Sequence, residues 1–320
     1  MADPSTGRQS GLPPAGESPS GAGTAFEAVR IPRELELSAA SRLVSEAAGP
    51  RSQAARRLVT AAAMHGIDLS LMWGTVDRAS DGRPVRVRQA CLAVPGSGKT
   101  AAMVLSGPGT ERSGHGERVA ALEAACRAMQ EPGALGGRVV RLAQALPEPD
   151  EPWAVRAYLD AGFTKVGDLV YMRRPLSEPL DSAPGEWPDG ITVRPVASLE
   201  ADRGMLIEAL DRSYQQTLDC PELCGLRETA DVLESHRATG VFDHKIWWIA
   251  FRDSQPQGCI LLARAPEHRS VELVYLGLSP ELRGRGVGAG LLRLGLARIV
   301  GSAEAHHIAC AVDLRNTPAI

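Results

Sequence analysis

The chain has 320 residues, of which 44% are hydrophobic, and its formal net charge at pH 7 is -3. This length predicts about two domains, and the balanced charge argues against nucleic acid or an anionic membrane as the main partner. The six cysteines are scattered, and their one C-x3-C pair, Cys220 and Cys224, has no second pair to complete a zinc site. Composition therefore favours a reduced, cytoplasmic protein that needs no metal.

The first 25 residues are rich in Gly, Pro, Ser and Ala and lack the basic and apolar regions of a signal peptide. This composition predicts a disordered tail over residues 1–25. No apolar run reaches the roughly 18 residues of a membrane-spanning helix. We therefore expect no membrane partner.

Residues 26–175 have the pattern of a first folded unit. A strand is expected within 26–35, and two helices are expected within 38–66, broken at Gly49-Pro50. Three short apolar segments separated by turn residues then predict a meander of antiparallel strands, at 68–77, 84–96 and 100–106. The unit is completed by a helix, a strand, a helix and a last strand, at 117–130, 138–146, 151–163 and 168–176.

The segment "AVPGSGKT", residues 93–100, fits a relaxed Walker A pattern. That pattern binds phosphate only where a strand enters the loop and a helix leaves it. Here Lys99-Thr100 is followed by only six residues before Gly107-Pro108-Gly109, which is too short for the helix. We interpret the segment as a hairpin turn. A P-loop NTPase, in which Lys99 would matter for ATP binding, is the remote alternative.

A linker at 176–189, dense in Pro, Gly and acidic residues, separates this unit from residues 190–320. The pattern of the second unit predicts, in order, a strand, two helices, a three-strand meander, a glycine-rich loop, a helix and a strand. In the loop, Arg283, Gly286 and Gly288 fit R/Q-x-x-G-x-G between a strand and a helix. Glycines let the backbone approach a ligand closely, and N–H groups at a helix N-terminus favour an anion such as pyrophosphate. The alternatives are a glycine-rich helix start without a ligand and a dinucleotide fingerprint, although the latter usually follows the first strand of a parallel sheet.

In this motif and in its order of elements, the second unit resembles the GNAT superfamily of acyl-CoA-dependent N-acetyltransferases. The resemblance implies that the pantetheine arm of acetyl-CoA lies along Leu276, Gly277 and Leu278, where two strands splay apart. It also implies that backbone amides of the loop hold the pyrophosphate, at Arg283, Gly284, Arg285, Gly286, Val287, Gly288 and Ala289. The fold class expected is α/β (α+β): two tandem GNAT-like units, each a mixed, mainly antiparallel sheet flanked by helices.

An amine acceptor must lose a proton before it attacks, because an alkylamine with a pKa of roughly 10.4 is charged at neutral pH. Glu272 lies eleven residues before Arg283 on the same expected strand. That is the spacing at which the histone-type branch of the family places its catalytic glutamate. We take Glu272 as the candidate base, and an exposed strand carboxylate is the equally weighted alternative.

Residues 316–319, "NTPA", match the start of a family segment in which Asn316 contributes to cofactor binding. The family's tyrosine proton donor would follow, but the chain ends at Ile320, so the second unit is expected to be cut short. A simple turn is the other interpretation of Asn316. Between the first two helices of this unit, Cys220 and Cys224 are candidates to line an acceptor pocket, although the burial habit of cysteine favours buried structural residues.

The first unit repeats the family's tail pattern within residues 151–163, with Tyr158 in register. Its glycine-rich loop, residues 111–116, has Glu111 where Arg or Gln is expected, and an acid there would repel pyrophosphate. We therefore predict a degenerate GNAT-like domain at 26–175, with Tyr158 in a packing role. The layout is similar to that of tandem acetyltransferases that have one working half.

The sequence thus predicts an N-acetyltransferase that moves an acetyl group from acetyl-CoA directly to a primary amine. Its partners would be acetyl-CoA and an amine acceptor. The alternative from another class is a non-catalytic acyl-CoA-binding or interaction protein with the same fold. Neither the acceptor nor the oligomeric state follows from the sequence.

Overall fold

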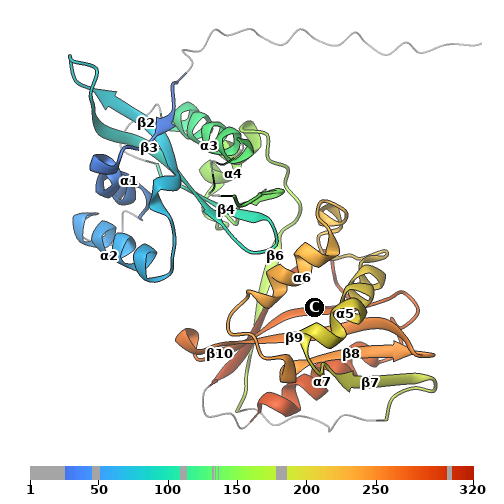
Figure 1. The fold of residues 1–320 in the computed structure, drawn as a ribbon. Coiled ribbons are helices and arrows are strands. Elements are labelled where there is room, and N and C mark those ends of the chain that lie inside the picture. The colour runs from blue at the N-terminus through green and yellow to red at the C-terminus, as the bar shows by residue number, and fades with distance from the viewer. Residues whose placement is uncertain are drawn as a thin grey trace, which may run out of the picture.

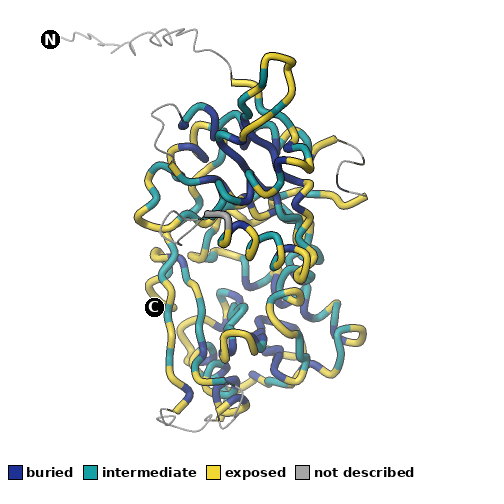
Figure 2. The backbone as a smooth tube through the Cα atoms, turned by 90° about the vertical axis from the view of Figure 1, so that its left-hand side faces the viewer, coloured by how far each residue is buried: buried dark blue, intermediate teal, exposed yellow. Residues whose placement is uncertain are grey.

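The structure is a computed structural model that describes residues 26–44, 51–108, 114–131, 133, 135, 137–177, 186–300 and 305–320. The predicted tail of residues 1–25, Glu111 in the first glycine-rich loop and most of the linker lie outside the described residues. Figure 1 shows two folded units, and Figure 2 shows that buried segments lie inside each of them.

The first sheet has five strands in the order β1-β2-β3-β4-β5. Its neighbours are antiparallel except for the parallel pair of β4 and β5. The strands are β1 (Val29–Arg30), β2 (Met72–Arg78), β3 (Pro84–Pro95), β4 (Thr100–Leu105) and β5 (Leu142–Gln144). The helices of this unit are α1 (Glu36–Leu43), α2 (Arg51–Met64), α3 (Gly114–Gln130) and α4 (Pro152–Asp160).

Hydrophobic side chains cover both faces of this sheet, because helices pack on each face. Met72 and Leu92 are opposite one another in the register and pack with α1 and α2, whereas Trp73 and Cys91, the next pair along, pack with α3 and α4. Adjacent strand residues point to opposite faces. The first unit is therefore a sheet between two helical layers.

The second sheet has six strands in the order β6-β11-β10-β9-β8-β7. All neighbours are antiparallel except the parallel pair of β10 and β11. The strands are β6 (Leu169–Pro175), β7 (Ile191–Pro195), β8 (Trp247–Arg252), β9 (Gln255–Ala265), β10 (Ser270–Leu278) and β11 (His307–Asp313). The helices are α5 (Leu199–Tyr214), α6 (Thr229–Arg237) and α7 (Val287–Ile299).

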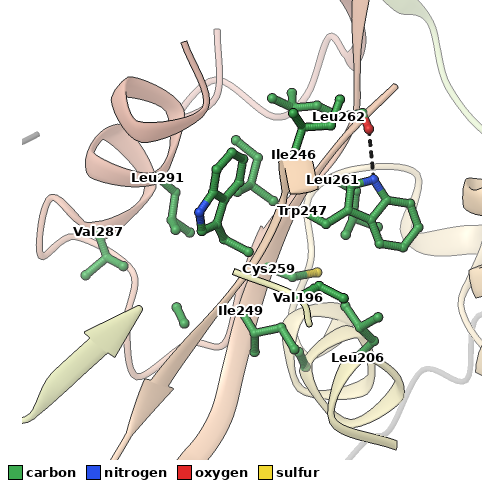
Figure 3. Close-up of a cluster of buried hydrophobic side chains, with 14 of the residues drawn as sticks. Val196, Leu206, Ile246, Trp247, Ile249, Cys259, Leu261, Leu262, Val287 and Leu291 are labelled. Carbon is green, nitrogen blue, oxygen red and sulfur yellow. Dashed lines mark hydrogen bonds between the residues drawn. The ribbon is translucent and has the colours of Figure 1, made fainter. Parts of the chain in front are cut away.

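Helices α5 and α7 lie on opposite faces of the second sheet. Ser213 of α5 meets Tyr275 of β10, while Gly295 of α7 lies against Ile260 and Leu262 of β9. The core between these layers includes Trp247, whose indole N–H donates to the carbonyl oxygen of Leu262 at 2.8 Å (Figure 3). The buried Trp therefore satisfies its polar group while it fills the core.

Strand β6 follows the first unit in sequence but pairs with β11 of the second sheet. The two strands are in register over seven positions, from Leu169 opposite Asp313 to Pro175 opposite His307. Figure 1 shows β6 running from the first unit into the second. The sequence predicts this strand correctly, but the strand belongs to the sheet of the second unit. The division of the chain into units at 26–175 and 190–320 therefore stays a proposal.

The fold class expected from the sequence is confirmed, with two mixed, mainly antiparallel sheets flanked by helices. The segment at 93–100 is the turn of the β3–β4 hairpin, as expected, because the chain continues from it into β4. The N–H of Gly96 donates to the carbonyl oxygen of Thr100 at 2.8 Å and closes that turn. A Walker A loop is therefore absent from this segment.

Candidate functional site

Strands β10 and β11 pair at only three positions and then diverge. Ser270, Val271 and Glu272 are opposite residues 307–309 of β11, and the pairing ends at Glu272. Beyond that point β10 continues to Leu278 and β11 to Asp313. One edge of β10 is therefore left without a neighbouring strand, which is the splay that the family resemblance implies.

A bulge at Val274 determines which side chains face this opening. Glu272 is opposite Ala263 of β9, while Tyr275 is opposite Leu261, and the register shifts between Leu273 and Tyr275. Because Ala263 and Leu261 are two residues apart on β9, they share a face, and so do Glu272 and Tyr275. Plain alternation places positions 272 and 275 on opposite faces. Sequence reasoning missed Tyr275 for this reason, since a bulge leaves no clear sequence signal here.

Tyr275 is enclosed by polar and aromatic groups from α5 and α6. Its hydroxyl is 2.7 Å from Ser213 Oγ, and its ring centroid is 5.2 Å from that of His236 and 5.8 Å from that of Tyr214. Burial raises the pKa of the Tyr275 phenol well above its usual value. The ring lies over Gly277, where an added Cβ would collide with it. The glycine therefore leaves space for this tyrosine.

His236 contributes a neutral imidazole to the same region. Burial, followed by the nearby charge of Arg227, lowers the pKa of His236 to about 4. Its Nε2 is buried and has no hydrogen-bond partner among the described residues. At neutral pH the face beyond Glu272 is thus lined by uncharged phenol and imidazole rings, with Glu272 half-buried at its edge.

The glycine-rich loop after β10 leads directly into α7. Gly284 and Gly286 have φ values of +71° and +79°, in the region that favours glycine, and α7 begins at Val287. No side chain of the described residues caps the helix, and a Cβ added at either glycine would meet none of their atoms within 4 Å. The first N–H groups of an uncapped helix are donors without partners, and the helix dipole makes this end positive. The open loop is suited to an anion such as pyrophosphate.

Arg283 has a positioning role in this loop. Its guanidinium donates to the carbonyl oxygens of Leu278, Ser213, Gln215 and Gln216, at 2.8 to 3.0 Å. Three of these carbonyls belong to the C-terminal end of α5 and the residues after it, where arginine is favoured. The side chain therefore fastens the loop to α5, and only the backbone of Arg283 is available for the predicted role.

The other predicted residues are found along the same strand, loop and helix. Leu276, Gly277 and Leu278 form the end of β10, Arg285 is exposed in the loop, and Gly288 and Ala289 lie in the first turn of α7. Asn316 lies in a turn after β11 and donates its N–H to the carbonyl oxygen of Asp313 at 2.9 Å. A turn residue was one of the two interpretations of Asn316.

The segment between α5 and α6 is anchored to the end of β11. Asp313, which is fully buried, accepts from the N–H of Cys220 at 3.1 Å and donates its own N–H to Asp219 at 2.8 Å. Arg315 bonds the carboxylates of both Asp313 and Glu222, and its hydrogen bonds hold the pKa of Asp313 well below the usual value. This network holds the segment beside the opening between β10 and β11.

The expectation of two buried structural cysteines is wrong. Cys220 is only partly buried and Cys224 is exposed. Cys220 has a φ of +44°, and its N–H donates a hydrogen bond to the Asp313 carboxylate. At Cys220 this contact holds the backbone to the end of β11, and the thiol is left only partly buried.

The first unit has an equally short parallel strand pair without the carboxylate. Strands β4 and β5 also pair at three positions, and the third is Ala102, where the second unit has Glu272. Tyr158 is buried, donates to the carbonyl oxygen of Met103 at 2.9 Å and packs against Phe163. Its predicted packing role is confirmed.

Other kinds of site have little support in the described part of the chain. No group of three or more His, Cys, Asp or Glu side chains there is arranged to hold a metal ion. A hollow on the α7 side of the second sheet, lined by Lys245, Trp248, Leu294, Arg298 and neighbours, contains none of the predicted site residues. No helix in the described ranges is both long and apolar enough to cross a membrane.

Comparison with known proteins identifies the class. Residues 210–320 match the model of the acetyltransferase (GNAT) family. With the diverging strands and the open loop described above, this match assigns residues 210–320 to the GNAT acetyltransferases, a class of acyltransferase enzymes. The suspected family is thereby confirmed.

Similarity to individual proteins extends over more of the chain than the family model does. It is 32% identical over 160 residues to the mycothiol acetyltransferase of Streptomyces griseus subsp. griseus, and this alignment covers 50% of the chain and 49% of that protein. The chain thus matches about half the length of this relative. A GCN5-related N-acetyltransferase from Sphaerobacter thermophilus is similar with a TM-score of 0.54 and 21% identity, over 92% of this chain and 88% of that one. The glucosamine N-acetyltransferase region of a fungal multi-domain β-N-acetylglucosaminidase has a TM-score of 0.52 and 16% identity, over 92% and 36% of the two chains. At these identities the two structures show the shared fold.

Proposed function

We propose that the protein is an N-acetyltransferase that moves an acetyl group from acetyl-CoA directly to a primary amine. The observation that carries the proposal is the geometry of β10. Its pairing with β11 ends at Glu272, and its other end runs into an open, uncapped loop at the start of α7. A carboxylate and an open helix start thus lie at the two ends of one strand edge, and this arrangement supports the proposal.

The residues that would bind acetyl-CoA are those of this edge and loop. Backbone N–H groups of residues 283–289 would hold the pyrophosphate at the positive end of α7. The pantetheine arm would lie along Leu276, Gly277 and Leu278, where β11 no longer occupies the edge of the strand. Asn316 would bind the cofactor from the turn after β11. Free N–H groups on this edge of β10 would also polarise the carbonyl oxygen of the acetyl group.

Glu272 would act as the general base for the amine. Its carboxylate accepts a proton from the ammonium group, so that the nitrogen bonds to the acetyl carbon as the bond from that carbon to sulfur breaks. The sulfur takes up the second proton that the amine loses. The acceptor reaches Glu272 from the face shared with Tyr275, since α7 covers the other face.

The proposal extends to the setting of the protein. We place it in the cytoplasm, with acetyl-CoA and an amine as partners and without a metal ion. The first unit, with Ala102 at the position corresponding to Glu272, is proposed to be a degenerate repeat at residues 26–175, and the working unit spans residues 190–320.

Calorimetric titration with acetyl-CoA, on the wild type and on Gly286→Glu, tests the proposal. The new carboxylate would lie at the anion site in a strained conformation, so we expect the wild type to bind and the affinity of the variant to fall by about 100-fold or more. Gly66→Glu is the matched control, because Gly66 also has a positive φ, +67°, with open space around it, in the other unit. The control is expected to bind like the wild type.

Three results would contradict the proposal. If the wild type does not bind acetyl-CoA, the loop has no such ligand. If Mg-ATP binds instead and Lys99→Met abolishes that binding, the NTPase alternative is correct. Binding of acetyl-CoA without transfer to any amine would favour the non-catalytic alternative.

A further inference from the structure

The β3–β4 hairpin of the first unit contacts α6 of the second. Arg227, just before α6, donates from Nη1 to the carbonyl oxygen of Gly98 at 2.7 Å. Ser235 Oγ donates to the carbonyl oxygen of Ser97 at 3.0 Å, and Lys99 Nζ is 2.8 Å from Asp231 Oδ2. The segment that resembles a Walker A motif thus makes three polar contacts with the other unit.

This contact depends on a glycine at position 98. Gly98 has a φ of +68°, and a Cβ added there would collide with the backbone oxygen of Asp231 and with Ser235 Oγ. The next residue, Lys99, also has a positive φ, 59°, which is uncommon for a residue with a side chain. Such strain persists only where the surroundings hold it. The hairpin tip is therefore shaped to fit against α6.

Helix α6 connects this contact to the proposed acceptor side. Asp231 and Ser235 are four residues apart, so they lie on one face of the helix, and that face meets the hairpin. The next residue, His236, packs against the ring of Tyr275. Tyr275 shares its face of β10 with Glu272. Packed side chains therefore run from the hairpin through α6 to the face from which an amine would approach.

We propose that residues 97–99 are a positioning element for the acceptor side of the second unit, so that the first unit forms part of the working site. The inference rests on the function proposed above, because it concerns the acceptor of that reaction. The three contacts fix α6, and α6 sets the position of His236 against Tyr275. The loop proposed to hold the pyrophosphate of acetyl-CoA follows the other end of β10 and makes none of these contacts with the hairpin, so the affinity for acetyl-CoA is not expected to depend on the hairpin.

Gly98→Ala tests this role in the full chain. The added methyl group pushes the hairpin away from α6 while it adds little volume. Gly82→Ala is the matched control, since Gly82 lies at the tip of the β2–β3 hairpin with a φ of +82° and no described atom within 4 Å of its Cβ position. Both changes strain a left-handed turn, but only the first disturbs a contact with α6.

Two readouts separate the docking of the hairpin from its role in the reaction. Hydrogen exchange of the α6 amides, residues 229–237, is expected to quicken about tenfold in Gly98→Ala because the helix opens locally more often. For acyl transfer, kcat/KM for the amine is expected to fall about tenfold, while the Kd for acetyl-CoA stays within about twofold. Gly82→Ala should change neither quantity.

A second pair of variants tests the same contact without a change at Gly98, in case Gly98→Ala does not fold. Lys99→Met removes the ion pair with Asp231 and leaves the backbone intact, and Lys165→Met removes the exposed pair of Lys165 with Asp168. Lys99→Met is expected to act in the same direction as Gly98→Ala, more weakly, because exposed ion pairs contribute little to stability.

The outcomes are distinct. If α6 exchanges at the wild-type rate in Gly98→Ala, the hairpin does not hold the helix and the inference fails. If α6 exchange quickens while kcat/KM for the amine is unchanged, the contact is structural only and the positioning role is overturned. If the wild type neither binds acetyl-CoA nor transfers acetyl groups, the proposed function fails, and the positioning role fails with it even where exchange shows that the hairpin docks.

Discussion

At the scale of single residues, Glu272 and Tyr275 determine what chemistry the opening in the second sheet can support. They share a face of β10 only because Val274 is bulged. The glutamate is partly exposed at the last paired position of the strand, and the tyrosine is enclosed between Ser213 and His236. The arrangement places one acid beside neutral polar rings, and Glu272 is therefore the residue that we propose as the base.

Replacement of Glu272 by Gln keeps the shape of the side chain and removes its ability to accept a proton. We expect the rate of acyl transfer to fall by about 100-fold or more, the range of general-base catalysis. Acetyl-CoA affinity should stay within about twofold, because the loop proposed to bind it is unchanged. Steady-state kinetics and calorimetry measure the two effects.

Glu267→Gln is the control for this change, because Glu267 is an exposed carboxylate in the short turn before β10. It should behave like the wild type. A Glu272→Gln protein with the wild-type rate would remove Glu272 from the mechanism and leave it an exposed strand carboxylate.

At the scale of elements, the segment from α5 to α6 is held from two sides. Asp313 and Arg315 fasten it to the end of β11, and the β3–β4 hairpin holds α6. Both anchors join segments far apart in the sequence, so the position of α6 depends on the assembly of the second sheet and on the contact with the first unit. The glycine-rich loop is held in a similar way, since Arg283 fastens it to the end of α5.

The Asp313 anchor gives a pH dependence of stability. The pKa of Asp313 lies below its ordinary value of 3.8 in the folded chain because Arg315 bonds its ionised form. A carboxylate with a depressed pKa stabilises the fold above the unfolded pKa, and this contribution is lost as pH falls through the two values. Asp313→Asn should therefore lower the unfolding midpoint by a few degrees at pH 7, and the difference from the wild type should shrink below about pH 4.

Thermal unfolding is monitored by circular dichroism at several pH values between pH 3 and pH 7, about one pH unit apart, and the unfolding midpoints measure this effect. Asp168→Asn is the control, since the carboxylate of Asp168 forms an exposed ion pair with Lys165. A difference between Asp313→Asn and the wild type that stays constant with pH would show that the charge of Asp313 has no part in it.

At the scale of the whole molecule, β6 links the two units. The strand follows α4 of the first unit but covers the outer edge of β11 in the second sheet, and Leu176 after it is buried in the second core. An unpaired strand edge is a site for pairing with other chains. The first unit thus contributes both a strand and a hairpin to the second.

Two shortened chains test the role of β6. Residues 186–320 lack the strand, whereas residues 164–320 retain it. We expect the longer one to be monodisperse and to unfold cooperatively, and the shorter one to aggregate, because the exposed edge of β11 and the lost burial of Leu176 both disfavour the monomer. Size-exclusion chromatography and thermal unfolding distinguish the two. Equal cooperativity in both chains would show that the second sheet does not need β6.

Local patterns in the sequence determined most of the elements and one part of the site. Turn residues and apolar periodicity located the helices and the meander strands, because these signals act over a few residues. The motif at Arg283, Gly286 and Gly288 located the loop, and at Gly286 the φ of +79° is one that glycine adopts without strain. The short segment after Lys99 was enough to predict a hairpin in place of a phosphate loop.

Only the tertiary structure decided which segments meet. The pairing of β6 with β11, the contact of Gly98 with α6 and the anchoring of Cys220 by Asp313 each join residues more than 90 positions apart. The bulge at Val274, which turns Tyr275 toward the Glu272 face, depends on the register with β9. Contacts of this kind arise from long-range packing and strand register, and neither leaves a pattern in the neighbouring residues.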